Sequence, residues 1–214
     1  DLSGPKRYRQ NYCLPEGNRR RLATMKIVFA TKNEGKVREI TEMLGSTDIT
    51  LLSLNHFEFL PEIIEDGNTY QENALKKAKI ISEYTGETVL ADDSGLQVDF
   101  LGGEPGVYSA RYAGEGATDE ENNVKLLTKL KDVPREKRTA SFFCALVLYH
   151  PGGHYQSFEA RWRGLIIDER RGTNGFGYDP IFLAPEWNKT AAELPADIKN
   201  TISHRGQAFA KLKS

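Results

Sequence analysis

Short apolar runs alternate with amphipathic stretches through the first half of the chain. The runs 25–30 (MKIVFA) and 49–54 (ITLLSL) are rich in aliphatic residues and are followed by polar ones, as is typical of buried strands. Between them, Val37, Ile40 and Leu44 recur at helical spacing. The pattern predicts that the chain begins with a strand, a helix and a second strand.

The strongest helix prediction covers residues 69–86. Its apolar face is made of Tyr70, Ala74, Ala78 and Ile81. Thr69 and Glu72 have the spacing of a capping box, and Gly86 stands where glycine commonly ends a helix. The same Thr-x-x-Glu pattern opens the segment 118–130, which predicts a further helix.

Longer runs with strand character fill the second half of the chain. Residues 138–150 and 154–167 are joined by the turn-forming sequence PGG, which predicts a hairpin. A short strand over 181–183 and a closing helix from about Ser203 follow. The order predicts an α/β fold with a central mixed β-sheet flanked by helices, in which part of the sheet is antiparallel. Ligands of such sheets tend to bind where strands end and helix N-termini point.

The size and charge of the chain narrow the class of protein. Its 214 residues suffice for one large domain or two small lobes, and no apolar run approaches the roughly 20 residues of a membrane helix. A net charge of −1 argues against a nucleic-acid partner. Residues 1–24 carry a net charge of +4 and no apolar period, so we interpret them as a flexible basic extension, with organelle targeting as the alternative. Residues 25–214 then form the functional domain.

The cysteines and most histidines suggest no site of their own. Cys13 and Cys144 make no disulfide framework, and Cys144 lies in an apolar run where a small core residue is expected. This usage fits a reducing, cytoplasmic compartment. His56, His150 and His154 lack metal-ligand spacing, and we assign them no function.

The segment 30–36 (ATKNEGK) joins a predicted strand to a predicted helix and is the first candidate for ligand binding. A helix N-terminus offers free N–H groups and a positive dipole end, both suited to phosphate. Hydrogen bonds from Thr31 and Asn33 and charge from Lys32 and Lys36 would add to these. The segment does not match the phosphate loop G-x-x-x-x-G-K-[ST], because Ala30 replaces its first glycine and Val37 its hydroxyl residue. A phosphate-loop kinase or GTPase is therefore disfavoured.

Acidic residues make the second candidate. They are Glu65 and Asp66, before the helix predicted from residue 69, and Asp92 and Asp93, after a predicted strand over 88–91. Adjacent like charges repel, so Asp92 and Asp93 at a strand end suggest a metal or proton-transfer site, with a solvated turn as the alternative. Mg²⁺ commonly binds one or two protein carboxylates together with substrate phosphates. A carboxylate could also deprotonate an attacking water.

The last two candidates lie near the C-terminus. In 172–182 (GTNGFGYDPIF), glycines let the backbone approach a ligand, Phe176 and Tyr178 offer rings for stacking a base, and Asp179 offers an acceptor. The alternative is a glycine-rich turn whose aromatic rings are buried. A further polar cluster, at the start of the closing helix, contains Lys199, Ser203, His204 and Arg205.

Taken together, seven segments appear in an order that resembles the inosine/xanthosine triphosphate pyrophosphatases, the Ham1-like group. They are ATKNEGKVREI, TYQENALKKA, LADDSGL, GGEPGVYSARYAG, FGYDPIF, KTAAEL and ISHRGQA. The resemblance covers about Met25 to Lys213. It implies an elongated α/β fold of two lobes with a nucleotide cleft between them, usually in a homodimer. It also implies Mg²⁺-dependent hydrolysis of ITP, dITP and XTP to the monophosphate and pyrophosphate, which removes deaminated purines from the nucleotide pool.

The resemblance also implies roles for particular residues. Those implied to hold the triphosphate are Thr31, Lys32, Asn33, Glu34, Gly35 and Lys36. Glu65 and Asp93 would bind the metal, and Asp93 would accept the proton of the attacking water, with Ser94 beside it in the substrate site. Those implied to form the base and phosphate pocket are Phe176, Gly177, Tyr178, Asp179, Lys199, His204 and Arg205.

Selectivity is expected to come from the 6-oxo edge of the purine. A donor such as Arg205 suits an oxo group and is left unpaired against the amino group of adenine. The chain departs from the family pattern at Lys32, where a small residue is common, and at Asn174, where glycine is common. Two other interpretations stay open, a Maf-like pyrophosphatase for other modified nucleotides and a non-catalytic nucleotide- or RNA-binding module.

Overall fold

The computed structural model describes residues 25–214. The predictions for residues 1–24, with Cys13, lie outside the described residues. Within residues 25–214, no helix is both long and apolar enough to cross a membrane.

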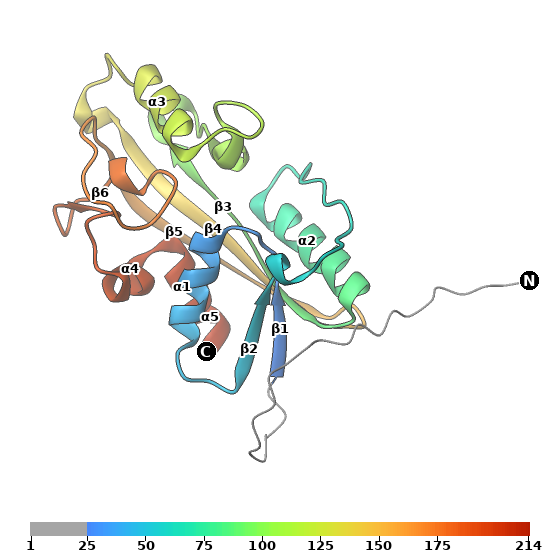
Figure 1. Ribbon diagram of the computed structural model, residues 1–214. Helices are drawn as coiled ribbons and strands as arrows, with labels where there is room; N and C mark the ends of the chain where they lie inside the picture. Colours follow the sequence, from blue (N-terminus) through green and yellow to red (C-terminus); the bar gives the residue numbers. More distant parts are fainter. Residues whose placement is uncertain (1–24) are drawn as a thin grey trace, which may run out of the picture.

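Seven strands in the described part form one open sheet in the order β2-β1-β3-β4-β5-β6-β7 (Figure 1). Their bounds are β1 Met25–Phe29, β2 Ile49–Ser53, β3 Thr88–Val98, β4 Thr139–Tyr149, β5 Tyr155–Ile166, β6 Phe182–Ala184 and β7 Lys189–Thr190. Strand β1 pairs in parallel with β2 and β3, and all other pairs are antiparallel. The predicted mixed sheet with an antiparallel part is confirmed. The strand predicted from residue 181 begins at Phe182, because Asp179–Ile181 form a short 3-10 turn.

Five α-helices accompany the sheet within residues 25–214. They are α1 Glu34–Leu44, α2 Tyr70–Thr85, α3 Asp119–Lys129, α4 Ala196–Ile202 and α5 His204–Lys213. Helix α4 was not predicted, since it is short and has no side-chain cap. The capping box predicted for α3 is complete. At α2, Thr69 accepts the N–H of Glu72 as predicted, but the Glu72 carboxylate accepts from the N–H of Asn68 instead of Thr69.

The helices cover opposite faces of the sheet. Helix α2 packs on the face that carries Val89 and Ala91, whereas α1 and α5 pack on the face that carries Leu90 and Leu146. Cys144 is buried on this second face, which confirms it as a core residue. Because side chains alternate along a strand, neighbouring residues of β3 face different helices.

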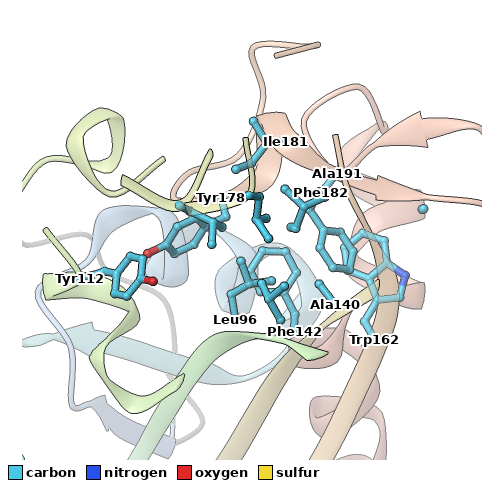
Figure 2. Packing of buried hydrophobic residues seen from close by; sticks show 14 of the residues in the cluster. Leu96, Tyr112, Ala140, Phe142, Trp162, Tyr178, Ile181, Phe182 and Ala191 are labelled. Atoms are coloured by element: carbon cyan, nitrogen blue, oxygen red, sulfur yellow. The ribbon is translucent and has the colours of Figure 1, made fainter. Parts of the chain in front are cut away.

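A third apolar cluster fills the other end of the long strands, next to α3 (Figures 1 and 2). In it the Phe142 ring lies 4.4 Å from Phe182 and the Trp162 ring 5.0 Å from Phe182, centroid to centroid. The long strands β3, β4 and β5 thus link two lobes, each with its own packed core.

The placement of Asp92 and Asp93 corrects one prediction. They do not follow the end of a strand, because β3 continues to Val98. The parallel pairing of β1 with β3 ends at Leu90, while antiparallel pairing with β4 runs on through both aspartates. The two carboxylates therefore stand where one neighbouring strand stops, which opens the sheet beside them.

Candidate active site

A cavity of about 630 Å³ lies between the two lobes and collects most of the predicted site residues. Those that line it are Thr31, Lys32, Asn33, Lys36, Glu65, Asp93, Ser94, Phe176, Gly177, Tyr178, Asp179, Lys199, His204 and Arg205. Glu34 and Gly35 are outside this lining, as are Asp66 and Asp92. The cavity has a volume suited to a nucleotide-sized ligand.

The turn before α1 forms one end of the cavity. The Asn33 side chain caps α1 by accepting the N–H of Lys36 at 3.0 Å, and the N–H of Asn33 donates to the Thr31 hydroxyl at 3.1 Å. Glu34 points elsewhere, since its carboxylate accepts from Asn55. The turn therefore presents the N-terminus of α1 to the cavity together with the side chains of Lys32 and Lys36.

Asp92 and Asp93 point to opposite faces of the sheet, so they avoid each other. Asp92 is fully buried, 3.1 Å from the Lys36 ammonium and 2.9 Å from the nearest Arg205 nitrogen. Burial alone would raise the pKa of Asp92, but the charges of Lys36 and Arg205 outweigh it and hold that pKa well below the usual range. Asp92 is therefore a permanent buried anion that fixes two cations.

Asp93 faces the cavity and α2. Its carboxylate accepts from the Asn73 amide and from the N–H of Ser94, each at 3.0 Å, and lies 3.9 Å from the Lys77 ammonium. Burial raises the pKa of Asp93, and Lys77 only partly offsets this. A held carboxylate with a raised pKa at a cavity wall is suited to accepting a proton.

Two carboxylates at this wall can hold a metal ion. The Lys77 ammonium also lies 3.0 Å from Glu65, so one cation contacts both Glu65 and Asp93. Within residues 25–214 no group of three or more histidine, cysteine or acidic side chains could hold a metal. Two oxygen donors completed by water and substrate oxygens match the preference of Mg²⁺, and the residues present fit that ion. Asp66 is exposed, pairs with Lys76 and does not join this pair.

Part of the cavity wall belongs to a buried ionic network that the sequence did not reveal. Glu39 of α1 contacts the Lys199 ammonium at 2.7 Å and an Arg205 nitrogen at 2.6 Å. Lys199 also contacts Asp179 at 2.5 Å. The network ties α1 to α4 and α5, and through Asp179 it holds the loop that precedes β6.

Arg205 is mostly occupied within this network. Its guanidinium makes four hydrogen bonds, to Asp92, Glu39 and Ser94, out of five N–H groups. At most one donor is left for a base, so its function as a base-reading donor stays a prediction.

The other end of the cavity is aromatic. The His204 ring stacks on Phe142 at 4.8 Å, and its buried Nδ1 has no partner among residues 25–214. Burial holds the pKa of His204 well below its usual range, so the ring is neutral. Phe176 is half-buried, with Lys199 at 5.3 Å from its ring. This end offers a flat apolar surface, as the stacking of a planar heterocycle would require.

Tyr178 and Asp179 are more buried than the stacking hypothesis implies. The Tyr178 ring belongs to the third core cluster, and its hydroxyl donates to the Ser109 carbonyl at 2.8 Å. Asp179 accepts from the N–H of Phe176 and pairs with Lys199. Their contacts make them supports of the loop, and the alternative of a buried aromatic ring describes Tyr178.

The Phe176 ring reaches across the cavity to α1. A Cβ atom added at Gly35 would lie 2.4 Å from Phe176 Cδ1, so only glycine leaves room for the ring there.

We expect Gly35→Ala to displace Phe176 and to raise KM for the substrate about tenfold, although alanine favours a helix by about 1 kcal/mol. Steady-state kinetics and thermal unfolding would separate the two effects. A normal KM would contradict the contact.

Known proteins resemble this chain in sequence and in fold. The Ham1 family model matches residues 27–214. A dITP/XTP pyrophosphatase of Geobacter sulfurreducens is 55% identical over 88% of this chain and 94% of its own, and one of Bacillus licheniformis is 52% identical over 88% and 96%. The structure of a HAM1 protein from Coxiella burnetii superposes with a TM-score of 0.78 at 43% identity, over 88% of this chain and 96% of that one. By sequence and by fold, the chain belongs to the Ham1 family.

Proposed function

We propose that this protein hydrolyses dITP, ITP and XTP to the monophosphate and pyrophosphate, with Mg²⁺ as cofactor. The relatives named dITP/XTP pyrophosphatases support the substrate class. The observation that carries the proposal is the position of Asp93, whose held carboxylate faces the same cavity as the α1 N-terminus and the His204 ring.

The phosphate end binds and orients the triphosphate. Thr31, Asn33 and the α1 N-terminus donate hydrogen bonds, while Lys32 and Lys36 offset the phosphate charge. Asn73 and the N–H of Ser94 hold the Asp93 carboxylate in place. Asp93 then accepts the proton of the water whose attack breaks the anhydride bond between the α- and β-phosphates and releases pyrophosphate. A fixed geometry lowers the entropic cost of that step.

Glu65 and Asp93 would hold the Mg²⁺. When bound, the ion supplies positive charge that stabilises the phosphate oxygens and the departing pyrophosphate. Lys77 contacts both carboxylates and carries its charge into the same wall. Its pKa is raised because Asp93 and Glu65 outweigh the effect of burial, so it stays protonated at neutral pH.

The aromatic end binds the base. Phe176 offers a ring for stacking, and the neutral His204 ring, which stacks on Phe142, lies in the lining of the same cavity. The remaining N–H of Arg205 suits a 6-oxo group, whereas the amino group of adenine offers no acceptor there. The homodimer and the cytoplasmic location belong to the same proposal and rest on the family resemblance and on the cysteine usage.

Pyrophosphate release from ITP, dITP, XTP, GTP and ATP, with Mg²⁺ and with a chelator, tests the proposal. We expect Mg²⁺-dependent release from the first three, with kcat/KM at least about 100-fold above that for ATP, since an unpaired buried polar group is penalised strongly. Equal rates on ATP would contradict it. A preference for modified pyrimidines would favour the Maf-like alternative, and binding without turnover the non-catalytic one.

A further inference from the structure

Two side chains of helix α3 form hydrogen bonds with the backbone N–H and carbonyl of Gly177. Asp119 Oδ2 accepts the N–H of Gly177 at 2.6 Å, and the Asn123 amide donates to the Gly177 carbonyl at 2.9 Å. Asp119 and Asn123 are four residues apart, so they lie on one face of the helix. Both polar backbone groups of Gly177 are thereby bound by side chains of one element.

This peptide sits between the two aromatic residues of the loop. Gly177 has a φ of +62°, a conformation that favours glycine, and Gly172 and Gly175 in the same loop also have positive φ. A loop with three such glycines has many alternative conformations. Tyr178 is anchored in the core, whereas the half-buried Phe176 ring extends into the cavity toward Gly35. The bonds to Gly177 therefore limit where Phe176 can lie.

The burial of Asn123 favours a function for it beyond stability. The residue is 3% exposed, and its Oδ1 is buried with no partner among the described residues. A buried polar atom without a partner costs free energy, and Leu126 of α3 and Leu130, which directly follows the helix, pack into the apolar core. An apolar residue would suit the packing at position 123. The presence of an amide side chain there is therefore explained by its hydrogen bond to the Gly177 carbonyl.

We propose that Asp119 and Asn123 are positioning residues for base selection, which act by fixing Gly177 and through it Phe176. The expected kinetic effect rests on the proposed function. The contacts between α3 and Gly177 are independent of it. It extends the site to helix α3, which the sequence motifs did not connect with the base.

The main test is Asp119→Ala with Glu120→Ala as its matched control. Glu120 lies in the same first turn of α3, but its ion pair is with Arg170, and the backbone of Gly177 is bound by Asp119 and Asn123 instead. We expect Asp119→Ala to raise KM for ITP about tenfold and to lower the ITP-to-ATP ratio of kcat/KM about tenfold, with kcat changed less than about threefold, in line with the loss of one charge-assisted hydrogen bond. Asp119→Asn keeps an acceptor and should recover most of the difference.

Asn123→Leu supplies an independent variant. It removes the donor to Gly177 and fills the same space, so we expect the same shift in KM and selectivity without a loss of thermal stability. If both Asp119→Ala and Asn123→Leu had the same KM and the same ITP-to-ATP selectivity as Glu120→Ala, the proposal would be overturned.

Hydrogen–deuterium exchange separates this inference from the proposed function. Peptides that cover residues 173–182 should exchange faster in Asp119→Ala than in the wild type or in Glu120→Ala, whatever the substrate. Unchanged exchange there would overturn the positioning function. If the wild type released no pyrophosphate from ITP, the proposed function would fail while the exchange result still decided whether α3 fixes the loop.

Discussion

Asp93→Asn is expected to lower kcat at least about 1,000-fold while the protein stays folded. Asparagine cannot accept the proton of the attacking water, and loss of a general base costs 10²–10⁴-fold, with the loss of a metal ligand added to it. Burial already disfavours the charged carboxylate, which is why its pKa is raised. A neutral amide of the same shape can still accept from Asn73, so we expect the free energy of unfolding to change by less than about 1 kcal/mol.

Single-turnover pyrophosphate release and chemical denaturation measure the two effects on one sample. Asp66→Asn is the matched control, because Asp66 is an exposed carboxylate that pairs with Lys76 outside the cavity. It should turn over like the wild type. If Asp93→Asn kept a rate within tenfold of the wild type, Asp93 would not be the proton acceptor.

The sequence carried enough information for the scaffold. Apolar runs and periodicity located the first strand, α1 and α2, because each of these elements buries a regular stripe or face. The Thr-x-x-Glu capping pattern located α3, and the turn sequence PGG located the hairpin. Helix α4 escaped prediction because it is only seven residues long, and β7 because it is only two. Short elements depend on their neighbours for stability, and their own sequence carries little periodic signal.

The site was predicted less completely, and the reason lies in side-chain direction. The strand over 88–91 was expected to end at Asp92, but its pairing with β4 continues, so alternation sends Asp92 and Asp93 to different faces. The adjacency of Asp92 and Asp93 in the sequence suggested one shared site. In the structure Asp92 is a buried anion, whereas Asp93 faces the cavity.

Two missed residues had a signal that could have been used. Lys77 lies three residues after Ala74 and four before Ile81, and Asn73 lies four residues before Lys77, which places both polar groups on the buried side of α2. A lysine within an apolar helical stripe requires a buried partner, and Glu65 and Asp93 supply it. Glu39 gave no such signal, because its partners Lys199 and Arg205 are about 160 residues away in the chain.

Asp92→Asn is expected to lower the free energy of unfolding by about 3–5 kcal/mol at pH 7, the usual cost of removing one partner from a buried ion pair. The network balances three cations against three anions, and the substitution leaves one positive charge uncompensated. The cations are Lys36, Lys199 and Arg205, and the anions are Glu39, Asp92 and Asp179. Denaturant titration would measure the loss. Glu83→Gln, which removes one partner of an exposed pair with Lys79, should change stability by less than about 0.5 kcal/mol.

A lower pH and a second substitution both test the charge balance of this buried network. Because Lys36 and Arg205 depress the pKa of Asp92 despite its burial, its stabilising effect is present above the ordinary carboxyl pKa of about 4 and is lost as the pH falls toward the folded-state value. The difference between wild type and Asp92→Asn should therefore shrink below about pH 4. Adding Lys36→Met to Asp92→Asn restores the charge balance, so the double variant should be more stable than the sum of the single losses implies. Strict additivity would mean that Asp92 stabilises the fold through Arg205 alone, and that Lys36 is held for the phosphate instead of for the core.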